Sequence, residues 1–165
     1  MKIDDIIKAD KEYLFQNYGD RFPVAFKSGK GAVLFDTEGR RYVDFLAGIA
    51  VNSLGYGDEE YIAALKKQLD HLIHSSNLYY NQEQTEAAKL LSEKSFAGRT
   101  LFVNSVTEAN EAAIKLARRY GLSKHESRYR IISFKKSFHG RTFASMSATA
   151  QEKIHLGFGP IVPGF

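Results

Sequence analysis

The sequence has no cysteine among its 165 residues. Disulfide bonds and thiolate metal centres are therefore excluded, and such a chain suits a reducing cytoplasm. The sequence also lacks an apolar run long enough to cross a bilayer, and its first residues are too acidic for a signal peptide. We therefore expect a cytoplasmic location and no membrane partner.

The sequence lacks a basic tract as well. Its formal charge of +4 is spread along the chain, and Arg118-Arg119 and Lys135-Lys136 are only pairs. Nucleic-acid binding is thus a weak alternative, whereas anionic small molecules fit this charge. His71 and His74 have no carboxylate or cysteine at ligand spacing, so we predict no metal site.

The spacing of apolar residues predicts secondary structure along the whole chain. Helices are expected at 2–18, 59–73, 82–95 and from Ser105 or Thr107 to Arg118, and short strands at 24–26, 32–35, 41–45, 100–103 and 130–134. Residues 36–39 have the composition of a turn, and Asp58 is suited to cap a helix. Residues 144–150 are small and should pack tightly. The helix at 2–18 is amphipathic and either packs on its own domain or docks on a partner subunit.

A polar segment follows the predicted strand at 100–103. Asn104, Ser105 and Thr107 stand where the next helix begins, so Ser105 or Thr107 is suited to be its N-cap. Free backbone N–H groups at the positive end of the helix dipole form a seat for phosphate. The same residue types also serve a capped helix without any ligand, and this alternative stays open.

A second polar segment follows the predicted strand at 130–134. It contains an aromatic ring, an imidazole, a glycine and a guanidinium group in Phe138-His139-Gly140-Arg141. Ligands of α/β proteins bind at the carboxyl ends of strands. Together the two segments offer a phosphate seat, a flat face for stacking and a fork for a carboxylate.

The segments NSVTEANEAAIKLAR (104–118) and SFHGRT (137–142), in this order, resemble the class III pyridoxal-phosphate aminotransferases, most nearly the acetylornithine type. The similarity extends from about Tyr18 to Phe165. It implies an α/β fold, the N-terminal part of a PLP-dependent transferase of fold type I. The N-terminal helix and a small antiparallel β segment would occupy 1–57, and the start of the large, mostly parallel cofactor domain 58–165.

The resemblance also implies roles in binding pyridoxal phosphate. Ser105, Val106 and Thr107 would hold the phosphate through backbone N–H groups and hydroxyls. Phe138 would cover the ring, with His139 beside it. At the position of Val106 the family usually has glycine, which allows positive φ and close approach; a β-branched residue resists both.

The substrate would contact other residues. Arg141 would bind its α-carboxylate. Ile49, in the glycine-containing loop 47–55, would border it, where ornithine enzymes have a tyrosine; this favours a blocked amine such as N-acetylornithine. The chain departs from the family at Gly55-Tyr56-Gly57-Asp58-Glu59, where relatives usually have Gly-His-x-His-Pro.

The family's Schiff-base lysine and pyridine-binding aspartate lie beyond Phe165, so no catalytic residue is assigned. We expect the N-terminal portion of an enzyme that moves an amino group from N-acetylornithine to 2-oxoglutarate in arginine biosynthesis, inactive as an isolated chain. Its small-molecule partners would be amino and keto acids. Its polypeptide partner would be a second copy in a homodimer, or the missing C-terminal part. The alternative is a non-catalytic module that binds phosphate ligands or a relative.

Overall fold

The computed structural model describes all residues from Met1 to Phe165. They form two compact units, Met1–Tyr80 and Asn81–Phe165, and each is described by itself. The domain boundary expected at residue 57 is a family inference and stays a prediction. No helix combines the length and the apolar composition that are needed to cross a bilayer.

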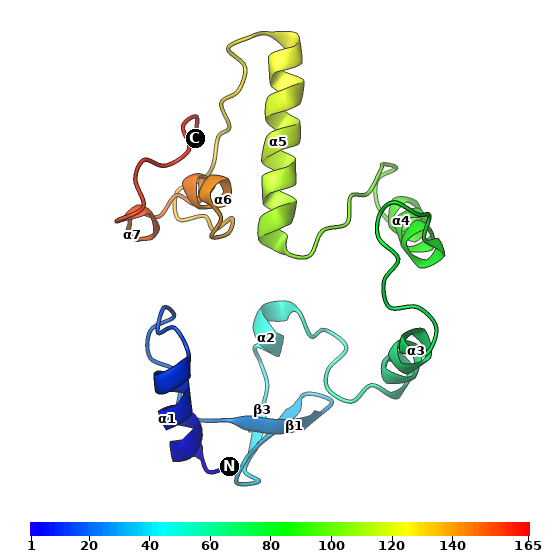
Figure 1. Cartoon of the computed structure of the whole chain (residues 1–165), viewed down its shortest axis with the longest axis vertical. Helices are drawn as coiled ribbons and strands as arrows, with labels where there is room; N and C mark the ends of the chain where they lie inside the picture. The colour runs from blue at the N-terminus through cyan, green and yellow to red at the C-terminus, as the bar shows by residue number, and fades with distance from the viewer. The chain divides into compact units, whose positions relative to one another are not determined.

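The first unit is built around a small antiparallel sheet (Figure 1). Its strands are β1 (Phe26–Lys30), β2 (Val33–Asp36) and β3 (Arg41–Val43), in that spatial order. The predicted β segment is thus confirmed, although its first strand begins where the predicted strand 24–26 ends. Helices α1 (Ile3–Tyr13) and α3 (Glu59–Leu69) flank the sheet in the sequence. Both end earlier than predicted, and Asp58 caps α3 by accepting from Tyr61 N at 2.8 Å.

Asp36 organises the hairpin between β2 and β3. Its buried carboxylate accepts hydrogen bonds from the backbone N–H groups of Glu38 and Arg40, from Arg40 Nε at 2.7 Å and from the Tyr42 hydroxyl at 3.0 Å. Gly39 supplies the positive φ, 83°, that the turn requires. Burial acts to raise the pKa of Asp36, but the hydrogen bonds from Arg40, Tyr42 and Glu38 lower it to about 2.

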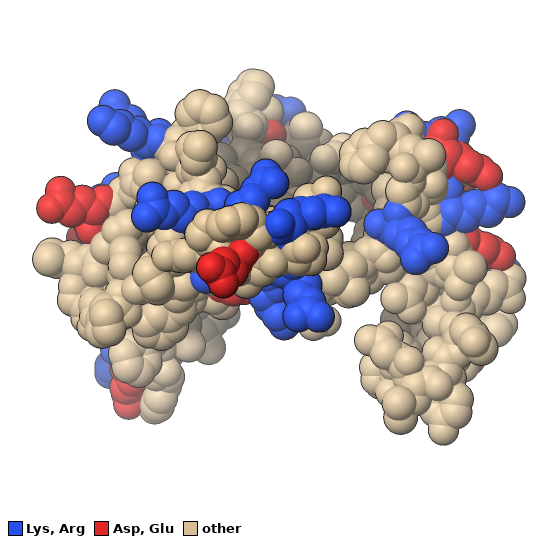
Figure 2. Space-filling view, turned by 90° about the horizontal axis from the view of Figure 1, so that it is seen from above, with Lys and Arg blue, Asp and Glu red and all other residues tan.

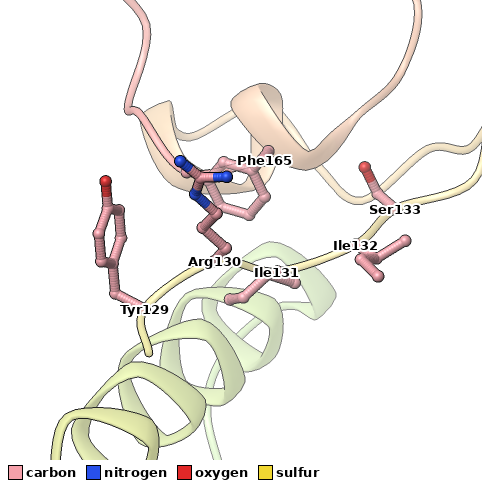
Figure 3. A pocket seen from close by; sticks show the side chains of 7 residues that line it. Tyr129, Arg130, Ile131, Ile132, Ser133 and Phe165 are labelled. Atoms are coloured by element: carbon pink, nitrogen blue, oxygen red, sulfur yellow. The ribbon is translucent and has the colours of Figure 1, made fainter. Parts of the chain in front are cut away.

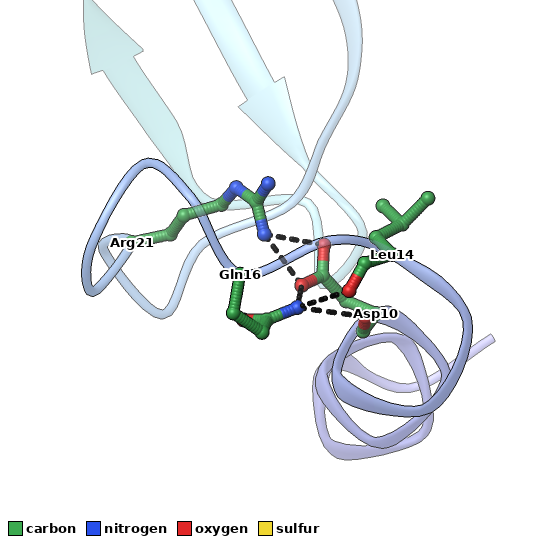
Figure 4. A network of polar contacts seen from close by, with 4 residues as sticks. All are labelled: Asp10, Leu14, Gln16 and Arg21. Carbon is green, nitrogen blue, oxygen red and sulfur yellow. Dashed lines mark hydrogen bonds and ion pairs between the residues drawn. The ribbon is translucent and has the colours of Figure 1, made fainter. Parts of the chain in front are cut away.

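Helix α1 is tied to its own unit. Asp10 accepts from Arg21 Nη1 at 2.6 Å, and the Gln16 amide donates to the carbonyls of Asp10 and Leu14 at 3.0 and 2.9 Å (Figure 4). The apolar stripe of α1 lines a cleft with the segment 19–25. These contacts support the interpretation that α1 packs on its own domain, while docking on a partner subunit stays a prediction.

Residues 47–50, predicted as part of a loop, form a short left-handed turn, α2 (Ala47–Ala50). The φ angles of Ala47, Gly48, Ile49 and Ala50 are 47°, 63°, 65° and 62°. Left-handed backbone costs about 1–2 kcal/mol for each residue with a side chain, so this turn requires support from its surroundings. Asp44 Oδ1 provides it by accepting from the N–H groups of Leu46 and Ala47 at 2.8 and 2.9 Å.

The second unit is helical. It contains α4 (Gln82–Lys94), the long helix α5 (Val106–Lys124), α6 (Phe143–Ala148) and α7 (Glu152–His155). Helix α6 packs against α5 and α7 (Figure 1). Residues 145–149 are buried, which confirms the tight packing predicted for 144–150.

The strands predicted at 100–103 and 130–134 are wrong for this structure. Neither segment has regular secondary structure, because a strand exists only where a neighbour pairs with it. Ile131 N donates to Gly164 O at 2.8 Å, and Lys135 forms an isolated parallel bridge with Ala150. No ladder forms along 100–103, and the Ile132 side chain is 94% exposed.

Candidate functional site

The start of α5 settles which residue caps the helix. Ser105 is the N-cap, with extended backbone, and its Oγ accepts from Glu108 N at 3.3 Å. Glu108 Oε2 in turn accepts from Asn104 N at 2.7 Å. Of the two predicted caps, Thr107 is therefore the second helical residue instead, and its side chain is available for other contacts.

The first turn of α5 presents unused backbone donors. The N–H groups of Ser105, Val106 and Thr107 make no hydrogen bond within the chain, because the helix begins there. Three such donors at the positive end of a 19-residue helix form a set that suits a phosphate group.

Val106 does not have the conformation that a glycine would require. It is the first helical residue, it is absent from the residues with positive φ, and its side chain is 77% exposed. The predicted conflict between a β-branched residue and positive φ therefore does not arise at this position.

The two sequence motifs meet at Gly140. This glycine is buried with φ of 131°, and a Cβ atom placed on it would lie 2.2 Å from Thr107 Oγ1 and 2.9 Å from Ser145 Cβ. The segment 138–142, which we call the arginine loop, therefore lies directly on the first turn of α5. Arg141, the next residue, is exposed at this junction.

The backbone of His139 is held from both sides. Its carbonyl accepts from Asn110 Nδ2 on α5 at 2.5 Å, and its N–H donates to Thr149 Oγ1 at 2.9 Å. Thr149 is completely buried, which makes this second anchor rigid. The Phe138 ring beside it is 57% exposed, so it can contact a ligand.

Glu111 is a polar centre of this junction that the sequence interpretation missed. Its Oε1 accepts from Thr142 Oγ1 and from the N–H groups of Ala144 and Ser145 at 3.1 and 3.0 Å. Partial burial acts to raise the pKa of Glu111, but the hydrogen bonds from Thr142, Ser145 and Ala144 lower it below its ordinary value. The only sequence signal was its spacing of four residues from Thr107, which puts both on one helix face.

Ile49, the last predicted site residue, belongs to the first unit. It lies on the left-handed turn α2, and its side chain is 78% exposed. It has the accessibility that a substrate contact requires, but no hydrogen-bonding group of its own.

A separate hollow lies beside residues 129–133 and the chain end (Figure 3). The Arg118 guanidinium lies 5.9 Å from the Tyr129 ring centre and 5.1 Å from that of Phe165, and it donates to Pro163 O. This hollow contains none of the predicted site residues, and its contacts explain how the last residues are held.

Charged side chains of both signs occur together on the surface. On the face in Figure 2, Lys and Arg side chains have Asp and Glu side chains between them. No group of three or more metal-binding side chains exists in the chain.

Known proteins resemble the chain over nearly all its length. The family model described as aminotransferase class-III matches residues 14–165. The acetylornithine aminotransferase of Caldanaerobacter subterraneus subsp. tengcongensis is 52% identical over 161 residues, which are 97% of this chain and 41% of that protein. That of Aquifex aeolicus is 52% identical over 154 residues, 93% of this chain and 41% of that protein.

Solved structures show the same relationship. Ornithine aminotransferase from Toxoplasma gondii ME49 matches 100% of this chain and 39% of its own, with a TM-score of 0.93 and 32% identity. A second structure of the Toxoplasma gondii enzyme, described as having partial occupancy of PLP at its active site, gives a TM-score of 0.89 at 32% identity and covers 99% of this chain and 39% of its own. This likeness confirms the predicted α/β fold class. The chain spans about two-fifths of the length of these relatives, and it belongs to the class III aminotransferase family.

Proposed function

We propose that the chain forms the phosphate-binding and carboxylate-binding part of an aminotransferase site of the acetylornithine type. The observation that supports this best is the contact of Gly140 with Thr107, which joins the arginine loop to the first turn of α5. The proposed amino donor is N-acetylornithine and the acceptor 2-oxoglutarate, in arginine biosynthesis, because the relatives at 52% identity are acetylornithine aminotransferases.

Pyridoxal phosphate fits the donors at the start of α5. Ser105, Val106 and Thr107 would hold its phosphate, chiefly through their three unused N–H groups. Phe138 would cover the ring, and His139 would lie beside it with its backbone fixed. When bound, this cofactor supplies an aldehyde group that carries the amino group between an amino acid and a keto acid, and a ring that withdraws electrons during the transfer.

Arg141 would bind the substrate. A guanidinium group holds a carboxylate with two parallel hydrogen bonds, which fixes the direction of the amino acid as well as its place. The rigid neighbours of Arg141, Gly140 and Thr142, limit how far its backbone can move. Ile49 is proposed as a substrate contact on the resemblance alone, with an apolar side chain that suits an acetylated amine.

The isolated chain is proposed to be inactive in transamination. None of its lysines matches the family's cofactor-binding lysine, and Lys135 and Lys136, the nearest in sequence to the arginine loop, are both exposed. An active protein would need a lysine and an acidic residue from further polypeptide, as a homodimer or by association with the remainder of an aminotransferase.

Titration of pyridoxal phosphate into the chain tests this proposal. We expect saturable binding, weakened about tenfold by Arg141→Met when N-acetylornithine is added, and unchanged by the control Arg128→Met. We expect no turnover and no single lysine labelled selectively and stoichiometrically by borohydride reduction, since exposed lysines react only weakly and without preference. A labelled lysine with turnover would contradict the proposed inactivity, and absence of any phosphate or cofactor binding would contradict the site.

A non-catalytic module is the second candidate. Exposed apolar side chains on the two segments predicted as strands, Leu101, Ile132 and Phe134, favour association with another polypeptide. Co-purification with an intact acetylornithine aminotransferase, followed by sedimentation, would test it. A monodisperse monomer that binds neither the enzyme nor phosphate would rule it out.

A further inference from the structure

Two hydroxyl groups and one carboxylate form a chain at the junction of the arginine loop with α5. Thr107 Oγ1 lies 3.0 Å from Thr142 Oγ1, and Thr142 Oγ1 is hydrogen-bonded to Glu111 Oε1. Such a chain has two possible directions, because each hydroxyl can donate or accept. The direction decides which hydroxyl hydrogen is available to a ligand.

The carboxylate fixes this direction. An ionised carboxylate only accepts hydrogen bonds, and the four donor groups around Glu111, the Thr142 and Ser145 hydroxyls and the N–H groups of Ala144 and Ser145, favour its ionised form. Thr142 must therefore donate its single hydrogen to Glu111. The contact between the two hydroxyls then uses the hydrogen of Thr107, so the chain runs from Thr107 through Thr142 to Glu111.

Ser105 is in the opposite situation. Its Oγ accepts from Glu108 N, which occupies a lone pair and leaves the hydroxyl hydrogen unused. An anion at the start of α5 can therefore receive a hydroxyl hydrogen bond from Ser105. The Thr107 hydroxyl already donates its hydrogen to Thr142, so Thr107 can offer only its backbone N–H to the anion.

The same carboxylate holds the arginine loop. The N-cap of α6, Thr142, makes no side-chain bond to its own helix, and Glu111 accepts from the N–H groups of Ala144 and Ser145 in its place. Ser145 Oγ also donates to Thr107 O at 3.1 Å. Glu111 thus joins the start of α6 to α5, with Arg141 directly before Thr142.

We propose that Glu111 is a positioning residue of the aminotransferase site. It holds the arginine loop on α5 and directs the Thr107 hydroxyl into the protein, so that Ser105 is the side-chain donor to the cofactor phosphate. This inference rests on the proposed function for its ligand, whereas the direction of the hydrogen-bond chain depends only on contacts within the protein.

The phosphate test compares two hydroxyl variants in the 165-residue chain. Inorganic phosphate and pyridoxal phosphate are titrated by calorimetry into Ser105→Gly and Thr107→Val, because glycine is nearly as good an N-cap as serine but has no hydroxyl. We expect Ser105→Gly to weaken both affinities about tenfold and Thr107→Val to change them less than about twofold. Equal losses, or a larger loss for Thr107→Val, would overturn the assigned direction.

The role of Glu111 is tested with two variants of similar length. Glu111→Gln keeps an acceptor oxygen, so its phosphate affinity should stay within about twofold of the wild type. Glu111→Met has no acceptor, so its phosphate affinity should fall about tenfold. Glu126→Gln, on the exposed loop after α5, controls for the lost charge. Unchanged phosphate affinity in a folded Glu111→Met protein would overturn the positioning role.

Amide NMR separates failure of this inference from failure of the proposed function. The Ala144 and Ser145 amide resonances should move upfield in proton shift in Glu111→Met, partly recover in Glu111→Gln and stay fixed in Glu126→Gln. If wild-type protein binds neither probe, the proposed function fails. The amide shifts alone then test whether Glu111 holds the loop, and unchanged shifts in Glu111→Met would contradict it.

Discussion

The Tyr56 hydroxyl donates a 2.7 Å hydrogen bond to Asp44 Oδ2. The other oxygen of Asp44 accepts from the two N–H groups that lead into the left-handed turn α2. Tyr56 stands where the family usually has histidine, and its ring lies so close to Gly29 that a Cβ atom there would be 2.4 Å from it. A residue that departs from the family pattern therefore supports the loop that carries Ile49.

Replacing Tyr56 with phenylalanine should loosen this loop while the ring stays in place. We expect amide exchange at Ala47 to Ala50 to become roughly fivefold faster, because Asp44 loses one of its three donors. The hydrogen bond to Asp44 also raises the pKa of the Tyr56 phenol, so the variant should lose one of the two tyrosines with raised pKa, and the other, Tyr42, should still ionise late in an absorbance titration. Tyr80→Phe, at a fully exposed tyrosine, is the control and should leave the exchange rates unchanged.

Ile49→Gly should stabilise the first unit. A β-branched residue at φ of 65° is strained, and glycine adopts this conformation without a steric cost. We expect a gain of about 1 kcal/mol in the free energy of unfolding by urea. Lys66→Gly, inside the right-handed helix α3, should lose about 1 kcal/mol; a similar loss for Ile49→Gly would show that the turn is not left-handed.

Gly140→Ala should separate the arginine loop from α5. The new methyl group would lie within 3 Å of Thr107 and Ser145, so the loop must move. We expect the free energy of unfolding to fall by about 3 kcal/mol and phosphate binding to be lost. Gly157 also has positive φ, 85°, but open space around it. Gly157→Ala therefore measures the backbone strain alone and should cost about 1 kcal/mol with phosphate binding retained.

Asp36 should make stability depend on pH in the acid range. Its pKa falls from an ordinary 3.8 to about 2 on folding, so the unfolded state binds the proton more readily. The stabilisation is complete above pH of about 4 and is lost as the pH falls towards about 2. Urea midpoints between these values should fall steeply for the wild type and less steeply for Asp36→Asn. Asp20→Asn, at an exposed carboxylate, should follow the wild type, and parallel curves for all three proteins would contradict the prediction.

The sequence predicted the helices well, because the signals for helices are local. It predicted the strands poorly, because strands depend on partners far away in the sequence. The caps Asp58 and Ser105 bond to N–H groups three residues away, so the sequence contains the whole interaction. A strand at 130–134 depends instead on a neighbour that the pattern does not identify. Ala47 and Ile49 carry no sign of left-handed backbone, because that conformation comes from Asp44 and Tyr56.

The candidate site shows the same division. The motifs around Thr107 and Arg141 were identified from residue types, and the structure brings their backbones together at Gly140. Whether these residues bind cofactor and substrate stays a prediction. The sequence does not reveal the role of Glu111, because its partners Thr142 and Ser145 lie more than thirty positions away.

The buried residues of the second unit are mostly small or hydroxylated: Gly140, Ser145, Ser147, Ala148 and Thr149, with Met146 and Ile114 as the larger apolar ones. Ser147 Oγ donates to Phe143 O and accepts from Val162 N. Hydrogen bonds, more than contacts between apolar side chains, therefore stabilise this interior. Unfolding it uncovers little hydrocarbon. The heat capacity increment of this unit should therefore lie well below the usual value of about 12–15 cal/mol/K per residue, and its stability should change only slowly between cold and warm conditions.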